Sequence, residues 1–164
     1  LAALEPREAD ARVAALGAVE AVDPQAGIIL SMLTASEQLA AQDLQGAVES
    51  LNAVVLNGDV PQIYRDIAQF KALTLQAETM PAGERKQSFE TLSTAGNRLS
   101  LLAQEQMALI AIQEGDTAGA IEQYQTILSD AQVTPDLQQR ALQVIVALGG
   151  EPDLSGAPID ENNG

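Results

Sequence analysis

Two ten-residue segments of the chain are nearly the same. GAVESLNAVV begins at Gly46, and GAIEQYQTIL begins at Gly119, 73 positions later. Both begin with Gly-Ala, and apolar side chains then recur three residues apart, the spacing of one helix face. A helical segment that occurs twice in a chain of 164 residues predicts a fold assembled from similar helical units.

The repeat extends beyond these segments. Small residues recur at intervals of 37 and 36 residues, at Ala35, Ala72 and Ala108. Larger apolar residues recur at intervals of 38 and 35 residues, at Leu51, Phe89 and Tyr124. A period in the mid-thirties is typical of stacked helix-turn-helix pairs, in which small residues allow the helices to approach closely. We therefore predict that Ala47 and Ala120 are packing positions and that the glycine before each allows close backbone contact.

The fold expected is all-α, an α-solenoid of about three antiparallel helix pairs with an N-terminal helix and a capping helix. Apolar periodicity, prolines and glycines place the helices at about 6–22, 25–41, 44–56, 61–79, 81–93, 98–114, 117–129 and 135–148. Asp43 and Asp116 are predicted N-caps. We expect a linker helix over residues 1–23, one repeat domain over 24–149, and a disordered acidic tail over 150–164.

Composition excludes several classes of function. The formal net charge of −15 argues against nucleic acid and against an anionic lipid surface as a partner. The chain has no Cys and no His, which excludes Cys- or His-based metal sites and catalytic triads. Glu114 and Asp116 are the one carboxylate pair considered for hydrolysis, but few aromatic residues are present to form a sugar cleft. We expect no enzyme, no cofactor and no metal.

The repeated positions resemble the tetratricopeptide repeat. Residues Leu101–Leu128 have that motif's small residues at Ala108 and Ala120, its turn glycine at Gly115 and its aromatic at Tyr124. The first pair has Gln42 where the motif has the turn glycine, and the middle pair has Glu84-Arg85 where it has an alanine.

A narrower resemblance covers about residues 25–149. The strings YRDIAQFKALTLQAE and LSTAGNRLSLLAQEQMALIAIQEGDTAGAIEQYQTILSDAQVTPDLQQRALQVIVALG look like the YfgM-like tetratricopeptide domain of alphaproteobacterial envelope proteins. That resemblance implies a periplasmic domain behind an N-terminal membrane anchor, linked to the translocon and to chaperones. The chain starts at Leu1 rather than Met, so we expect any anchor to lie upstream, at the periplasmic face of the inner membrane.

Protein or peptide binding is the function expected, because stacked helix pairs curve and the first helices line the concave side. The predicted partner-binding residues are Met32, Ser36, Arg65, Asp66, Gln69, Leu73, Gln76, Arg98, Glu105, Leu109 and Gln113. The alternative is a self-associating structural protein that uses the apolar last helix. Its candidate residues are Leu137, Ala141, Leu142, Val144, Ile145 and Val146.

Overall fold

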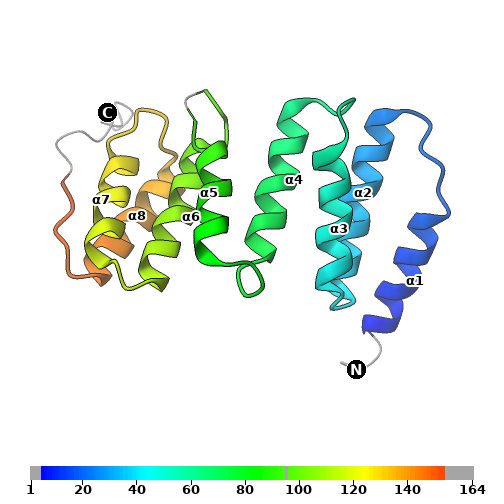
Figure 1. The fold of residues 1–164 in the computed structure, drawn as a ribbon, viewed down its shortest axis with the longest axis horizontal. Coiled ribbons are helices and arrows are strands. Elements are labelled where there is room, and N and C mark those ends of the chain that lie inside the picture. The colour runs from blue at the N-terminus through cyan, green and yellow to red at the C-terminus, as the bar shows by residue number, and fades with distance from the viewer. Residues whose placement is uncertain (1–4, 95, 154–164) are drawn as a thin grey trace, which may run out of the picture. The chain divides into compact units, whose positions relative to one another are not determined.

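The computed structural model describes residues 5–94 and 96–153, and in this part of the chain every regular element is a helix (Figure 1). The helices are α1 (Glu5–Gly17), α2 (Pro24–Ala40), α3 (Leu44–Leu56), α4 (Gln62–Leu75), α5 (Ala82–Leu92), α6 (Ser100–Gln113), α7 (Thr117–Leu128) and α8 (Pro135–Ala147). The all-α prediction is confirmed. Two helices end several residues earlier than predicted, α1 at Gly17 and α4 at Leu75.

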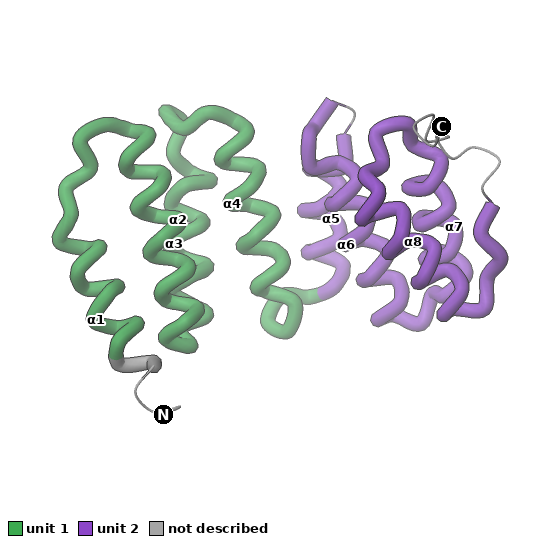
Figure 2. The backbone as a smooth tube through the Cα atoms, turned by 180° about the vertical axis from the view of Figure 1, so that it is seen from behind, with its two compact units in different colours: residues 1–81 green, residues 82–164 purple. Residues whose placement is uncertain are grey.

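The chain divides into two compact units, residues 1–81 (unit 1) and 82–164 (unit 2) (Figure 2). In unit 1, α1 packs on α2, α2 on α3, and α3 on α4; in unit 2, α5 packs on α6, α6 on α7, and α7 on α8. The boundary falls inside the range 24–149 expected to be one domain, and it separates the two helices of the predicted middle pair. The predicted tail lies mostly outside the described residues, which end at 153.

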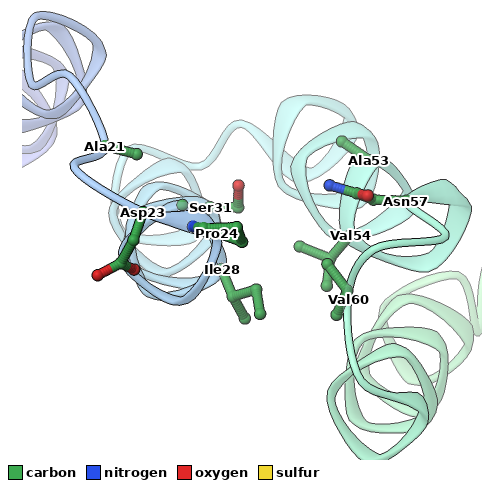
Figure 3. Close-up of a pocket in the computed structure, with 10 residues that line it drawn as sticks. Ala21, Asp23, Pro24, Ile28, Ser31, Ala53, Val54, Asn57 and Val60 are labelled. Carbon is green, nitrogen blue, oxygen red and sulfur yellow. The ribbon is translucent and has the colours of Figure 1, made fainter.

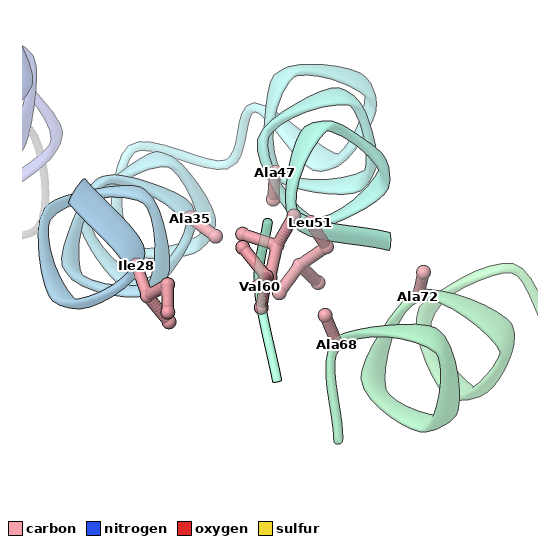
Figure 4. Packing of buried hydrophobic residues seen from close by; sticks show 8 residues of the cluster. Ile28, Ala35, Ala47, Leu51, Val60, Ala68 and Ala72 are labelled. Carbon is pink, nitrogen blue, oxygen red and sulfur yellow. The ribbon is translucent and has the colours of Figure 1, made fainter. Parts of the chain in front are cut away.

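The core of unit 1 contains the small and large residues that the repeat singled out. Figure 4 shows Ala35 of α2 and Ala47 and Leu51 of α3 close together, with Ala68 and Ala72 of α4 on the other side. Ile28, Val54 and Val60 complete this buried cluster. Alanines at the facing positions let α2, α3 and α4 approach, while Leu51 fills the remaining space.

The core of unit 2 repeats this arrangement. The buried cluster of α6, α7 and α8 consists of Ala108, Tyr124, Ile127, Leu128, Leu137, Ala141 and Ile145. Ala120 and Phe89 are buried as well, so the packing positions predicted from the repeat are confirmed. At Arg85, where the motif has an alanine, a long charged side chain is buried, and its Nη2 donates to Oε1 of Gln113 at 2.8 Å.

The two Gly-Ala pairs have a different physical reason from the one predicted. Asp43 and Asp116 are the N-caps of α3 and α7, and their Oδ1 atoms accept from the N–H groups of Gly46 and Gly119, each at 2.9 Å. A Cβ at Gly46 or Gly119 would lie 2.1 or 2.2 Å from the Oδ2 of its capping carboxylate. These glycines make room for a helix cap rather than for a neighbouring backbone, so the predicted reason is wrong.

The turn before each cap is also repeated. Gln42 and Gly115 both have left-handed backbone, with φ of 64° and 81°. The next residue, Asp43 or Asp116, donates its N–H to the carbonyl five residues back, at 2.8 and 2.9 Å. This is the Schellman end of a helix, which favours glycine because the left-handed conformation costs an L-residue about 1–2 kcal/mol. Gln42 therefore replaces the turn glycine without changing the turn.

The cap geometry predicts opposite outcomes for two Gly→Ala substitutions. Gly83→Ala in α5 meets open space, so we expect the free energy of unfolding to rise by up to about 1 kcal/mol. Gly119→Ala displaces the Asp116 carboxylate, and the lost cap of about 1 kcal/mol offsets that gain. Urea denaturation measures both, and in an Asp116→Ala background Gly119→Ala should become stabilising. Equal gains from Gly83→Ala and Gly119→Ala in the wild type would contradict the cap explanation.

Candidate functional site

Exposed apolar side chains are concentrated in unit 1. Among the described residues, the large exposed ones of unit 1 are Val19, Val22, Ile29, Leu33, Leu39, Leu44, Leu56 and Tyr64. Those of unit 2 are Leu109 and Val146. Scattered exposed apolar residues are normal, but a group of them around a concavity marks a binding surface. The grooves of unit 1 are therefore the candidate site.

The first groove lies between α1 and α2 and encloses about 320 Å³. It is lined by Arg12, Ala15, Leu16, Val19, Leu33 and Glu37. We call these residues the α1–α2 groove. Val19 and Leu33 are about half exposed, at 53% and 48%. Four of the six lining residues are aliphatic, and the groove is accessible to another molecule.

An ion pair joins the two helices of the α1–α2 groove. Nε of Arg12 donates to Oε2 of Glu37, and the Arg12 side chain is half exposed. Leu33 precedes Glu37 by one helical turn on α2, and Ile29 precedes Leu33 by another turn, so the three follow one line. Ile29 is 60% exposed. The apolar surface therefore continues past the groove lining toward the start of α2.

A second groove lies between the first turns of α3 and the end of α4, and encloses about 440 Å³. It is lined by Leu44, Gln45, Val48, Glu49, Gln76 and Thr79, which we call the α3–α4 groove. Nε2 of Gln45 donates to Oε1 of Glu49 at 2.9 Å. Leu44 and Val48 are the aliphatic residues in this lining, which is otherwise polar. This surface combines apolar contact with amide and carboxylate groups.

A third space, of about 260 Å³, opens where α2 begins and α3 ends. Figure 3 shows Ile28, Val54 and Val60 directed toward it, while the Asp23 carboxylate points away. Two polar side chains here already have partners: Oδ1 of Asp23 accepts from Ala26 N at 2.7 Å, and Oδ1 of Asn57 accepts from Asp59 N at 3.0 Å. This space is the open end of the unit 1 core, with the Asp23 carboxylate used in a helix cap and the Asn57 amide used in a turn.

The predicted partner-binding residues of unit 1 differ in exposure. Ser36 is exposed, and Met32 is half-buried against the core cluster. Arg65, Gln69 and Gln76 are half-buried, and Gln76 lines the α3–α4 groove.

Two of the predicted residues are buried. Asp66 is 8% exposed and its Oδ1 accepts from Gln62 Nε2 at 2.6 Å, while Leu73 is 5% exposed. The expectation that Asp66 and Leu73 line an open surface is therefore corrected, because a buried side chain is not available to a partner.

In unit 2, Arg98, Leu109 and Gln113 are exposed as predicted for a surface. Glu105 is a further correction, since it is 8% exposed and bound to Arg140 of α8. The Nε and Nη2 atoms of Arg140 donate to Oε1 and Oε2 of Glu105, both at 2.9 Å. A fork of two parallel bonds fixes α8 against α6 and occupies both carboxylate oxygens.

The phenol of Tyr124 is buried beside this pair. Burial raises the pKa of Tyr124 to about 12, with a further rise from the Glu105 charge and a smaller opposing effect of Arg140. A raised pKa means that the folded chain holds this proton more tightly than the unfolded chain does. The corresponding stability is present below pH 10 and is lost as the pH rises from about 10 through about 12.

The carboxylate pair considered for hydrolysis includes a residue with a structural role. Asp116, one member of the pair considered for hydrolysis, caps α7, and its Oδ1 already accepts from Gly119 N. The residues that the structure describes contain no group of three or more His, Cys, Asp or Glu side chains arranged to hold a metal ion. None of the described helices has the length and apolarity needed to cross a bilayer.

The α1–α2 groove was missed by the sequence reasoning, although a signal was present. Residues 28–33 of α2 are apolar at five of six positions, more than one buried face of a helix requires. Ile28 and Met32 face the core, while Ile29 and Leu33 are exposed. The surplus of aliphatic residues on this helix was the available indication of a second apolar surface.

Comparison of the chain with protein-family models, with curated proteins and with solved structures found no match.

Proposed function

We propose that this protein is a non-enzymatic interaction scaffold that binds a segment of another protein through its helical surface. The observation that supports the proposal is the concentration of exposed apolar side chains in unit 1, where Val19 and Leu33 line one groove and Leu44 lines another. Aliphatic surface left open to water is unfavourable, by about 25 cal/mol for each Å² that a partner would cover. A partner that covers these grooves would therefore gain binding energy from them.

The proposal extends to the cellular setting implied by the resemblance. A YfgM-like domain would stand on the periplasmic side of the inner membrane behind an upstream anchor, and would assist envelope protein biogenesis together with the translocon or its chaperones. Apolar grooves bordered by acid and amide groups suit transient contact with segments of other proteins. No cofactor enters this proposal, and nucleic acid is disfavoured as a partner by the net charge of −15.

Self-association through α8 receives less support. Leu137, Ala141 and Ile145 are buried in the unit 2 core, and Val146 is the exposed member of the predicted set. The apolar residues of this helix are thus mostly covered within their own unit.

Site-specific photocrosslinking in cells tests the proposal. A photoreactive residue at Leu33 or Leu44 samples one groove each, and the same residue at Leu56 is the matched control, because Leu56 is exposed in unit 1 and lines neither groove. We expect defined protein adducts from a groove position and few from Leu56. Identical adduct patterns at the three positions would contradict a scaffold that binds through these grooves. Leu73 is unsuitable for such a test, since it is buried.

A further inference from the structure

We propose that the α1–α2 groove binds an amphipathic helix whose apolar face is flanked by Lys or Arg. This inference rests on the proposed function and names the class of partner. Its basis is the presence of half-exposed Val19 and Leu33 in one groove of an acidic unit, with a formal net charge of −7 over residues 1–81.

The geometry of the α1–α2 groove suits the binding of a helix. Its walls are two packed helices, with Arg12 and Leu16 four residues apart on α1, and Leu33 and Glu37 four residues apart on α2. Val19 lies two residues after the end of α1. Side chains at these spacings form ridges along each helix, and a third helix can lay its own ridge between them. Ile29 lengthens the α2 ridge by one turn and gives an incoming helix further apolar contact.

Other modes of peptide recognition find less support in this groove. Strand addition needs an open sheet edge, and the described residues contain no strand. Proline-rich segments dock on aromatic residues, and the groove lining has none. Phosphorylated segments need a cluster of Arg, whereas the lining has one Arg, whose Nε is bound to Glu37. A helix in a groove is the mode that remains.

The charges of α1, α2 and the segment between them favour basic residues on the partner. Over residues 8–40 the acidic side chains are Glu8, Asp10, Glu20, Asp23 and Glu37, and the one basic side chain is Arg12. Arg12 is already paired with Glu37, while Glu8, Asp10, Glu20 and Asp23 are exposed. Of these, Glu8 lies one helical turn before Arg12 on α1, on the face that lines the groove, and unit 1 as a whole has a formal net charge of −7. A helix that brings Lys or Arg beside its apolar face would be attracted to this acidic unit, and an acidic helix would be repelled.

The same charges argue against a second copy of this chain as the occupant. Unit 1 has eleven Asp and Glu against four Lys and Arg, a formal net charge of −7. Two α1–α2 grooves that faced each other would bring two units of like net charge together, which is unfavourable without a compensating basic surface.

Designed peptides test the inference on the full chain. The first peptide is an amphipathic helix with a Leu stripe flanked by Lys, the second replaces each Lys with Glu, and the third scrambles the first to remove the stripe. Fluorescence anisotropy measures their binding to the wild type, to Leu33→Gln and to Leu56→Gln. Leu56→Gln is the matched control, since it is the same change at an exposed Leu of unit 1 outside the groove. Gln avoids adding a charge that would itself attract Lys.

We expect the Lys peptide to bind at least tenfold more tightly than either of the others, and Leu33→Gln to weaken it at least fivefold while Leu56→Gln leaves it within twofold. Equal binding of the Glu peptide, or no effect of Leu33→Gln, would overturn the inference. If Leu33→Gln fails to fold by circular dichroism, Val19→Gln on the opposite wall replaces it under the same criteria.

Three further outcomes show whether this inference fails alone or together with the proposed function. If Leu44→Gln abolishes peptide binding and Leu33→Gln does not, the partner binds in the α3–α4 groove, so the scaffold function stands and this inference fails. If sedimentation shows a wild-type dimer that Leu33→Gln dissociates, the occupant is a second copy and the inference is again overturned. If no peptide binds and no groove position crosslinks in cells, both proposals fail.

Discussion

Replacing Arg140 with methionine is expected to lower the free energy of unfolding by about 2–3 kcal/mol. The change leaves the Glu105 carboxylate buried with neither of its two hydrogen bonds from Arg140. Breaking a buried ion pair typically costs 3–5 kcal/mol, and we expect less here because the Arg140 side chain is 47% exposed and solvent screens its charge. Urea denaturation followed by circular dichroism measures the loss.

A double-mutant cycle separates the ion pair from simple packing. Glu105→Met combined with Arg140→Met removes both charges and keeps side chains of similar length, so we expect it to recover at least half of the loss. Replacing both members of a buried pair by apolar residues is often neutral, while removing one is not. If Arg140→Met alone leaves the free energy of unfolding unchanged, then the pair does not fix α8 against α6.

The phenol of Tyr124 gives this cycle an independent spectroscopic measurement. In a Tyr64→Phe background the tyrosinate absorbance reports Tyr124 alone, since the chain has two Tyr residues. Loss of the Glu105 charge should lower the pKa of Tyr124 from about 12, and loss of the Arg140 charge should raise it further. A pKa that stays the same in both variants would contradict the coupling of the three side chains.

The helices and their packing positions could be predicted from the sequence because both depend on local patterns. The start of α8 follows from Thr134, whose Oγ1 accepts from Leu137 N, and from Pro135 at the first turn. The burial of Ala35, Ala72 and Ala108 follows from their regular spacing on apolar helix faces. Such signals are set by neighbours within one or two turns, so one sequence contains them.

The candidate site was harder to predict from the sequence, because the exposure of a side chain depends on contacts between helices. Glu105 has the polarity of a surface residue, and only the position of Arg140, 35 residues later, makes its burial favourable. Leu33 has the polarity of a core residue, yet the core face of α2 is already supplied by Ile28 and Met32. Helical periodicity identifies the apolar stripe of a helix but not which of its edges a neighbouring helix covers.

The repeat predicts a second large loss of stability, for substitutions that enlarge the small packing residues. Ala108→Leu in α6 and Ala120→Leu in α7 are each expected to lower the free energy of unfolding by about 1–3 kcal/mol. Both alanines are fully buried, at 0% exposure, and α6 packs directly on α7. Three additional carbon atoms at either position have no free space, so the two helices must move apart or adopt strained side-chain rotamers.

Ala118→Leu is the matched control, because Ala118 is exposed on the same helix two residues before Ala120. Thermal unfolding of the three variants should place Ala118→Leu within about 0.5 kcal/mol of the wild type, as is usual for surface substitutions. If all three variants unfold like the wild type, the close helix approach inferred from the repeat is wrong. A loss at Ala108 and Ala120 but not at Ala118 would show that Ala120 leaves room for α6. This role is separate from that of Gly119, which leaves room for the Asp116 cap of α7.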